Sequence, residues 1–133
     1  MSDPTEYLYL DDLIDLASTL LGDPPPIRDI GLLGSAAARP QAAAFGQDAY
    51  PDLLTKAAAL MQSIVNNHAL VDGNKRLGWL ATAVFLELNG VKASRASNDD
   101  VYELVIWIAA SGPALDDITT RLRRLVQPAL RYG

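Results

Sequence analysis

The sequence contains no cysteine and only one histidine, His68. The absence of cysteine excludes disulfide bonds, thiolate metal sites and cysteine nucleophiles, and it fits a reducing compartment. Half of the 133 residues are hydrophobic, so the chain can bury a continuous core without covalent cross-links. We therefore expect a single domain that covers residues 1–133.

Basic residues are also few: 11 Lys and Arg stand against 16 Asp and Glu, for a net charge of −5. A protein that binds nucleic acid through its phosphates normally carries a basic face. The one basic cluster lies near the C-terminus, where it suits the solvated face and end of a last helix: Arg121, Arg123, Arg124 and Arg131. We therefore expect no direct nucleic-acid partner.

Long apolar runs are missing as well. No segment approaches the roughly 20 apolar residues that cross a bilayer, and residues 77–88 include polar positions. Residues 1–6 are acidic and polar, unlike the basic start of a signal peptide. These features predict a soluble, cytoplasmic protein without a membrane partner.

The hydrophobic pattern predicts an all-α bundle. Apolar residues recur at helical spacing in most of the chain, with Gly22, Asn89-Gly90 and Gly112-Pro113 as end signals. We expect a short extended strand over 7–10, and an extended link over 91–96. We expect one helix capped by Asp11 or Asp12, a short one over 32–38, one that starts at Pro51, and one that begins at Gly73 and carries an apolar stripe over 77–88. Two more follow, one capped by Ser97 or Asn98 and a last one over 115–126.

Residues 41–50 have no strong period and contain Gly46, Asp48 and several alanines. This composition predicts a surface loop or a loose β-hairpin. One small hairpin is thus the only departure that we expect from an all-α fold.

The most informative segment is residues 68–76, His-Ala-Leu-Val-Asp-Gly-Asn-Lys-Arg, which lies between two strongly apolar helical patterns. The imidazole of His68 can act as a general base near neutral pH. The carboxylate of Asp72 can hold Mg²⁺ together with phosphate oxygens. Gly73 allows an anion to approach the free N–H groups of a helix start, and Asn74 adds a neutral donor.

Lys75 and Arg76 place two cations at the same helix start. Cations there oppose the helix dipole and cost a few tenths of a kcal/mol, so a purely structural start favours acidic residues instead. Each of these residues alone has an ordinary structural explanation. His68 is typical of a cap or turn, Asp72-Gly73 of a turn, and Lys75-Arg76 of a solvated charged pair. Their combination in one segment predicts an anionic ligand.

This segment resembles the Fic motif, His-Pro-Phe-x-Asp/Glu-Gly-Asn-Gly-Arg. Lys75 in place of the second glycine is similar to the Doc branch of the family, His-x-Phe-x-Asp/Asn-Ala/Gly-Asn-Lys-Arg. Segments on both sides of the motif also resemble Doc sequences: 28–33, 38–41, 45–46, 50–51 and 85–90.

The resemblance implies a Fic/Doc helical fold and a toxin. Most Fic proteins transfer AMP from ATP, whereas Doc-type proteins transfer the γ-phosphoryl group, in the known case to a threonine of elongation factor Tu, and arrest translation. By position, His68 resembles the base and Asp72 the residue that binds Mg²⁺. Residues 73–76 (Gly73, Asn74, Lys75 and Arg76) resemble the site for the ATP phosphates.

Two positions depart from the usual pattern. Leu70 replaces the phenylalanine that anchors the loop in the core, and we expect altered packing rather than loss of the site because leucine is also apolar. Ala69 replaces the proline, at a position that the Doc pattern leaves open. Residues 38–50 resemble the flap that guides the target peptide, with its tip at Ala44, Phe45 and Gly46, although a plain connecting loop is the alternative.

The chain lacks the Ser/Thr-x-x-x-Glu-Gly/Asn inhibitory motif of other Fic proteins. The resemblance implies control by a separate antitoxin of the Phd type, which folds a disordered segment onto the toxin. Two alternatives to the kinase stay open: an AMP transferase with an unusual loop, and a non-catalytic helical interaction module, which only Leu70 favours.

Overall fold

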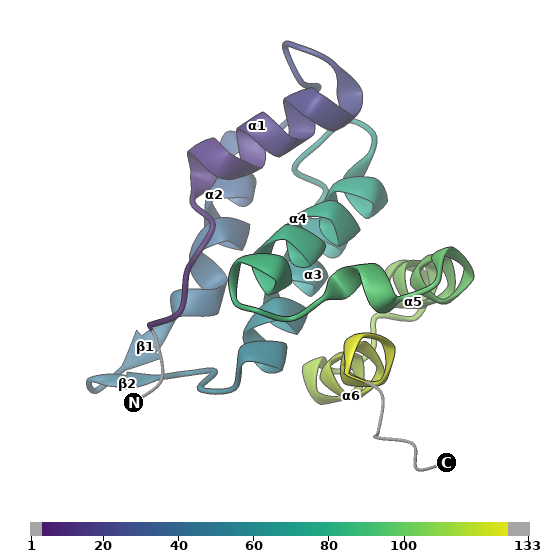
Figure 1. Ribbon diagram of the computed structural model, residues 1–133. Helices are drawn as coiled ribbons and strands as arrows, with labels where there is room; N and C mark the ends of the chain where they lie inside the picture. The colour runs from purple at the N-terminus through teal and green to yellow at the C-terminus, as the bar shows by residue number, and fades with distance from the viewer. Residues whose placement is uncertain (1–3, 128–133) are drawn as a thin grey trace.

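The computed structural model in Figure 1 describes residues 4–127. Over this range the chain forms six α-helices, two short 3-10 helices and one two-stranded sheet. In chain order they are α1 (Leu10–Leu21), α2 (Ile30–Ala38), η1 (Arg39–Gln41), β1 (Ala43–Ala44), β2 (Gln47–Asp48), α3 (Leu53–Asn67), α4 (Asn74–Leu88), η2 (Ala93–Arg95), α5 (Asn98–Ser111) and α6 (Leu115–Val126). This confirms the predicted all-α fold with one small hairpin.

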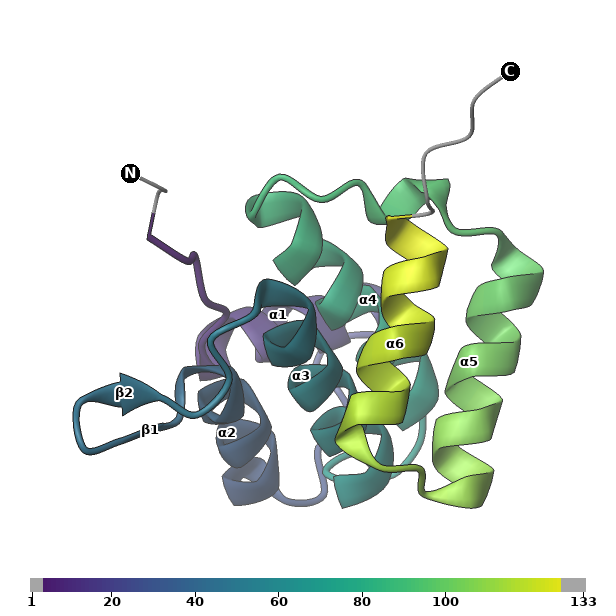
Figure 2. The same cartoon turned by 90° about the horizontal axis from the view of Figure 1, so that it is seen from below.

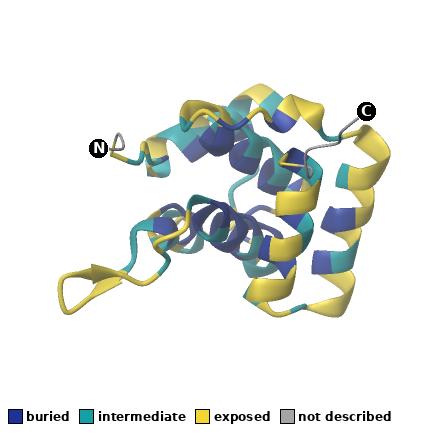
Figure 3. Ribbon diagram, turned by 60° about the horizontal axis from the view of Figure 1, so that its bottom comes forward, coloured by how far each residue is buried: buried dark blue, intermediate teal, exposed yellow. Residues whose placement is uncertain are grey.

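Helix α3 lies at the centre of the bundle and contacts α2, α4, α5, α6 and η1. Ten of its fifteen residues are buried: eight apolar residues, and with them Lys56 and Ser63. Figure 3 shows this buried centre in dark blue, between the outer helices. A helix with this much buried surface needs other helices to cover it.

Helices α3 and α4 pack closely because α4 has a glycine in the contact. A Cβ atom built on Gly78 would lie 2.6 Å from Cγ2 of Val65 in α3. Both Val65 and Leu77, next to the glycine, are buried. The two helices therefore lie side by side, and the short loop 68–73 joins the end of one to the start of the other (Figure 1).

Local capping explains several helix ends. Asp29 accepts a hydrogen bond from the N–H of Leu32 (3.0 Å) at the start of α2, and the Ser97 hydroxyl accepts one from the N–H of Asp100 (3.2 Å) at the start of α5. Gly112 ends α5 in the left-handed conformation, at φ 54°. The predicted bounds of α6 agree with the structure.

Several local predictions were wrong. Residues 7–9 are not in a strand: Tyr7 instead stacks on Phe85, with ring centroids 6.2 Å apart. Neither predicted aspartate is the cap of α1, which follows Tyr9, although Asp12 accepts the N–H of Tyr9 (2.8 Å). Helix α2 begins at Ile30, two residues earlier than predicted.

Pro51 precedes α3, which starts at Leu53, and so it does not lie in the first turn as we predicted. The link 91–96 is not extended throughout, since it contains η2. Of the basic cluster, Arg131 lies outside the described residues. No helix among residues 4–127 combines the length and the apolar character that a bilayer crossing requires.

The hairpin β1–β2 has two residues in each strand, pairing Ala43 with Asp48 and Ala44 with Gln47. Its turn residues both have positive φ, 53° at Phe45 and 75° at Gly46, as two-residue hairpin turns require. In Figure 2 the hairpin extends from the body of the protein on the side opposite α5 and α6. A hairpin this short depends on contacts at its base for stability.

A buried lysine supplies such a contact. Lys56 of α3 is 2% exposed, and its Nζ donates to the carbonyl of Pro40 (3.2 Å) and to Asp48 Oδ2 (3.1 Å). Burial lowers the pKa of Lys56, but the interactions with Tyr7 and Asp48 outweigh it and raise that pKa above its usual 10.5. The lysine therefore links α3, as a cation, both to β2 and to η1, which precedes the hairpin.

Candidate functional site

The candidate site is the loop between α3 and α4, together with the first turn of α4. His68 ends α3 in the left-handed conformation (φ 55°, ψ 45°), and Gly73 precedes α4 at φ 89°. His68 is a non-glycine residue in a region that L residues seldom adopt. Such a conformation persists only where the surrounding structure holds it, so the contacts of the loop decide where the imidazole lies.

One side of the loop is held by the segment that precedes α2. The N–H of Val71 donates to the carbonyl of Pro26 (2.8 Å), and the N–H groups of Arg28 and Asp29 both donate to the carbonyl of Ala69 (2.8 and 3.0 Å). Leu70 and Ile27 form an antiparallel bridge between these bonds. Sequence reasoning missed this pairing, because it joins segments about 40 residues apart that share no local pattern.

The other side of the loop is closed by Asn74. Its Oδ1 accepts from the N–H of Leu70 (3.0 Å), and its Nδ2 donates to the carbonyl of the same residue (3.0 Å). The Leu70 side chain is 1% exposed. Leucine therefore keeps the anchoring position that phenylalanine has in the family pattern, and the loop is closed around it.

Gly73 is required by two independent features of the structure. Its φ of 89° favours glycine, and a Cβ atom there would lie 2.7 Å from Cδ1 of Leu21 in α1. Because Gly73 has no side chain, α1 can approach the start of α4. The N–H of Gly73 itself donates to Oδ1 of Asp72 (2.8 Å).

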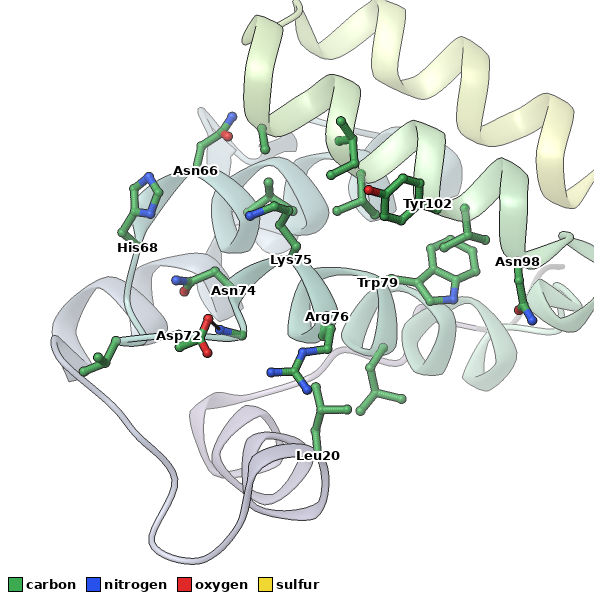
Figure 4. A pocket seen from close by; sticks show the side chains of 18 residues that line it. Leu20, Asn66, His68, Asp72, Asn74, Lys75, Arg76, Trp79, Asn98 and Tyr102 are labelled. Carbon is green, nitrogen blue, oxygen red and sulfur yellow. Dashed lines mark hydrogen bonds between the residues drawn. The ribbon is translucent and has the colours of Figure 1, made fainter.

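The first turn of α4 carries both cations of the motif. Lys75 and Arg76 are exposed, and the first N–H groups of an α-helix have no carbonyl partner within that helix. Lys75 and Arg76 extend in different directions from the helix, Arg76 toward Leu20 of α1 (Figure 4). A protein with net charge −5 thus has two cations and free N–H donors at one helix start, which is an arrangement suited to an anion.

A cavity of about 840 Å³ opens over this helix start. Figure 4 shows that the motif forms one end of it, while Trp79, Tyr102 and Asn98 extend toward the other. It is lined from the motif by His68, Val71, Asp72, Gly73, Asn74, Lys75 and Arg76, and from elsewhere by Leu20, Val65, Asn66, Trp79, Leu80, Asn98, Val101, Tyr102, Val105, Ile106 and Ala109. The cavity therefore has a charged end and a largely apolar end.

The structure brings together the six charged, polar or glycine residues that we predicted within the motif: His68, Asp72, Gly73, Asn74, Lys75 and Arg76 all line this cavity. Leu70 lies beneath them in the core, as an anchor would. The wall from α5, including Tyr102, was missed because nothing in its helical pattern separates a cavity wall from a solvated face.

The structure does not bring Ala44, Phe45 and Gly46 to the cavity. The hairpin lies near the start of α3, whereas His68 follows the end of that helix (Figure 1). A helix of 15 residues separates its two ends by about 22 Å. A role of the hairpin in guiding a target stays a prediction, and the segment that lies directly against the motif is residues 26–29.

Metal ligands are sparse among the described residues, where no three His, Cys, Asp or Glu side chains come close enough to hold an ion. Asp72 is the carboxylate that lines the cavity. A single carboxylate suits Mg²⁺ when phosphate oxygens and water complete its octahedral shell.

The chain is similar to known proteins over most of its length. The family model described as the Fic/DOC family matches residues 7–86, a range that includes the whole motif. The chain is also similar to a protein named Toxin Doc from Mycolicibacterium smegmatis. The two are 47% identical over 119 residues, which cover 89% of this chain and 92% of the relative.

Proposed function

Because this chain belongs to the Fic/DOC family, we propose that it is a Doc-type toxin that acts as an ATP-dependent protein kinase. It transfers the γ-phosphoryl group of ATP to a serine or threonine hydroxyl of a translation factor similar to elongation factor Tu. The observation that carries this proposal is the pair of cations Lys75 and Arg76, which share one cavity with the imidazole of His68.

In the proposed reaction, the target hydroxyl oxygen forms a bond to the γ-phosphorus. The bond between that phosphorus and the oxygen that bridges to the β-phosphate breaks, and ADP leaves. His68 accepts the proton of the hydroxyl as the general base. The exposed position of His68 at the cavity is suited to a hydroxyl that arrives on another protein.

The first turn of α4 contributes positioning and charge. Phosphoryl transfer needs little covalent help from a protein, and catalysis rests on holding the phosphates and compensating their charge. Gly73, Asn74, Lys75 and Arg76 would hold the phosphates, and Asn74 does so while its side chain keeps the loop closed on Leu70. Asp72 would hold Mg²⁺, which supplies charge compensation when it is bound.

Lys75 distinguishes the kinase from an AMP transferase in this proposal. A glycine at this position leaves room for the phosphates beside the main chain, whereas a lysine fills that room and adds a charge. ATP then binds with a different phosphorus facing the hydroxyl. On this basis Lys75→Gly shifts the reaction toward AMP transfer, and γ-transfer by that variant at an unchanged rate would contradict the role given to Lys75.

The toxin would be controlled by a separate, Phd-like antitoxin that folds onto it. The cavity suits such a segment because it has exposed hydrophobic side chains at both ends. Tyr102 is 68% exposed at the largely apolar end, and Val71 is 72% exposed at the motif end. The proposed target places the chain in the cytoplasm. Expression without the antitoxin should arrest growth, and expression of His68→Ala should not.

The proposal is tested by incubating the chain with elongation factor Tu and ATP labelled at the γ-phosphate, in parallel with ATP labelled at the α-phosphate. The γ-label should appear on the factor, and His68→Ala should abolish it. Lys75→Ala should lower the labelling, while the matched variant Lys92→Ala, at an exposed lysine outside the cavity, should not. The α-label on the factor would indicate AMP transfer, and no label, while a known active Doc labels the factor, would contradict both.

A further inference from the structure

Arg28 is a cation that the proposed reaction does not use, although it lies against the catalytic loop. It precedes α2 and is exposed. Its Nε donates to the carbonyl of His68 (3.0 Å), and its Nη2 donates to the same oxygen. Among residues 4–127, no carboxylate forms an ion pair with it. Both of these guanidinium hydrogen bonds therefore go to one main-chain oxygen, that of His68.

That oxygen needs a partner. His68 ends α3, and the last carbonyl groups of a helix find no donor within their own helix. The chain then turns through the left-handed conformation at His68, φ 55°, which is unfavourable for a residue with a side chain. A cation at the C-terminal end of a helix also interacts favourably with the helix dipole. Arg28 thus stabilises the peptide group that follows the imidazole-bearing Cα.

The guanidinium itself is held in place by the surrounding chain. The main-chain N–H of Arg28 donates to the carbonyl of Ala69 (2.8 Å). The main chain and the side chain of Arg28 therefore bind the carbonyl groups of two consecutive residues, Ala69 and His68. Pro24, Pro25 and Pro26 precede it and restrict the main-chain angles of the approach. The segment that carries Arg28 to the loop therefore has little main-chain freedom.

We propose that Arg28 is a positioning residue for His68: through the His68 carbonyl it fixes the turn that sets the direction of the imidazole. The inference rests on the proposed role of His68 as the base. Arg28 does not line the cavity, so its effect is on the orientation of the imidazole and not on the binding of phosphates. Its loss lowers the turnover number and leaves the KM for ATP unchanged.

The single histidine of the chain makes this testable without any activity. In the NMR spectrum of the whole protein, the ring Hε1 resonance belongs to His68 alone. In Arg28→Met this resonance should broaden or move toward the position of a free histidine, and Arg28→Lys, which keeps a donor, should restore part of the wild-type spectrum. The matched variant Arg95→Met, at another exposed arginine, should leave the resonance unchanged.

A His68 resonance in Arg28→Met that is the same as in the wild type would overturn the inference. So would a rise in the KM for ATP with the turnover number unchanged, because that result would assign Arg28 to nucleotide binding. If the resonance changes as expected while no variant and no wild-type protein transfers phosphate, the proposed function fails and the positioning of His68 stands.

Discussion

Replacing Gly78 with alanine adds one methyl group where α4 packs on α3. Alanine is favoured over glycine inside a helix by about 0.8–1 kcal/mol. The new Cβ, however, would lie 2.6 Å from Cγ2 of Val65, a buried, β-branched helical residue that has essentially one rotamer. Overpacking of this kind costs about 1–3 kcal/mol. We expect a net loss of about 1 kcal/mol in the free energy of unfolding.

Gly34→Ala in α2 is the matched control, because the nearest atom to its new Cβ would be Leu10 Cδ2 at 3.9 Å. This variant should gain about 0.5–1 kcal/mol. Urea denaturation measures both, and at about 2.1 cal/mol/K per residue the melting temperature should change by roughly 3–4 °C per kcal/mol. If Gly78→Ala is as stable as Gly34→Ala, the result contradicts the close packing of α3 on α4 at Gly78.

Three other substitutions test the loop and the buried lysine. Gly73→Ala should lose about 1–2 kcal/mol from its left-handed conformation and weaken ATP binding by calorimetry; Gly46→Ala, which has the same conformational cost and open space around it, should leave ATP binding unchanged. Asn74→Ala should lose about 1–3 kcal/mol in denaturation, because both main-chain groups of Leu70 lose their partner; wild-type stability would contradict the closed loop. Folding raises the pKa of Lys56, so the stabilisation that its charge provides is complete below about pH 10.5 and is lost as the pH rises through the folded value. The difference in the free energy of unfolding between wild type and Lys56→Met should therefore shrink in that alkaline range. A constant difference would contradict a raised pKa.

The helices and the motif were predictable from sequence because their signals are local. Apolar spacing and end residues such as Gly112 follow from the geometry of a single helix. The two cations at the start of α4 indicate an anion site from the sequence alone, since an isolated helix start disfavours them.

The frame of the loop was not predictable, because it depends on pairing across the chain. Arg28 and His68 are 40 positions apart, and no periodic pattern links them. Lys56 was missed for a similar reason: a lysine within an apolar helix is expected to face solvent, and its acceptors in η1 and β2 are visible only in the folded protein. The position of the hairpin relative to His68 was not predictable either, because it is set by the length of α3, which separates the two.

The proposed transfer of the γ-phosphoryl group, with His68 as the general base, is tested by the intact mass of elongation factor Tu after incubation with the chain, ATP and Mg²⁺. We expect the factor to gain the mass of one phosphoryl group with the wild-type chain and to gain nothing with His68→Ala. A gain equal to one AMP group, or a phosphoryl gain that persists in His68→Ala, would contradict the proposed reaction.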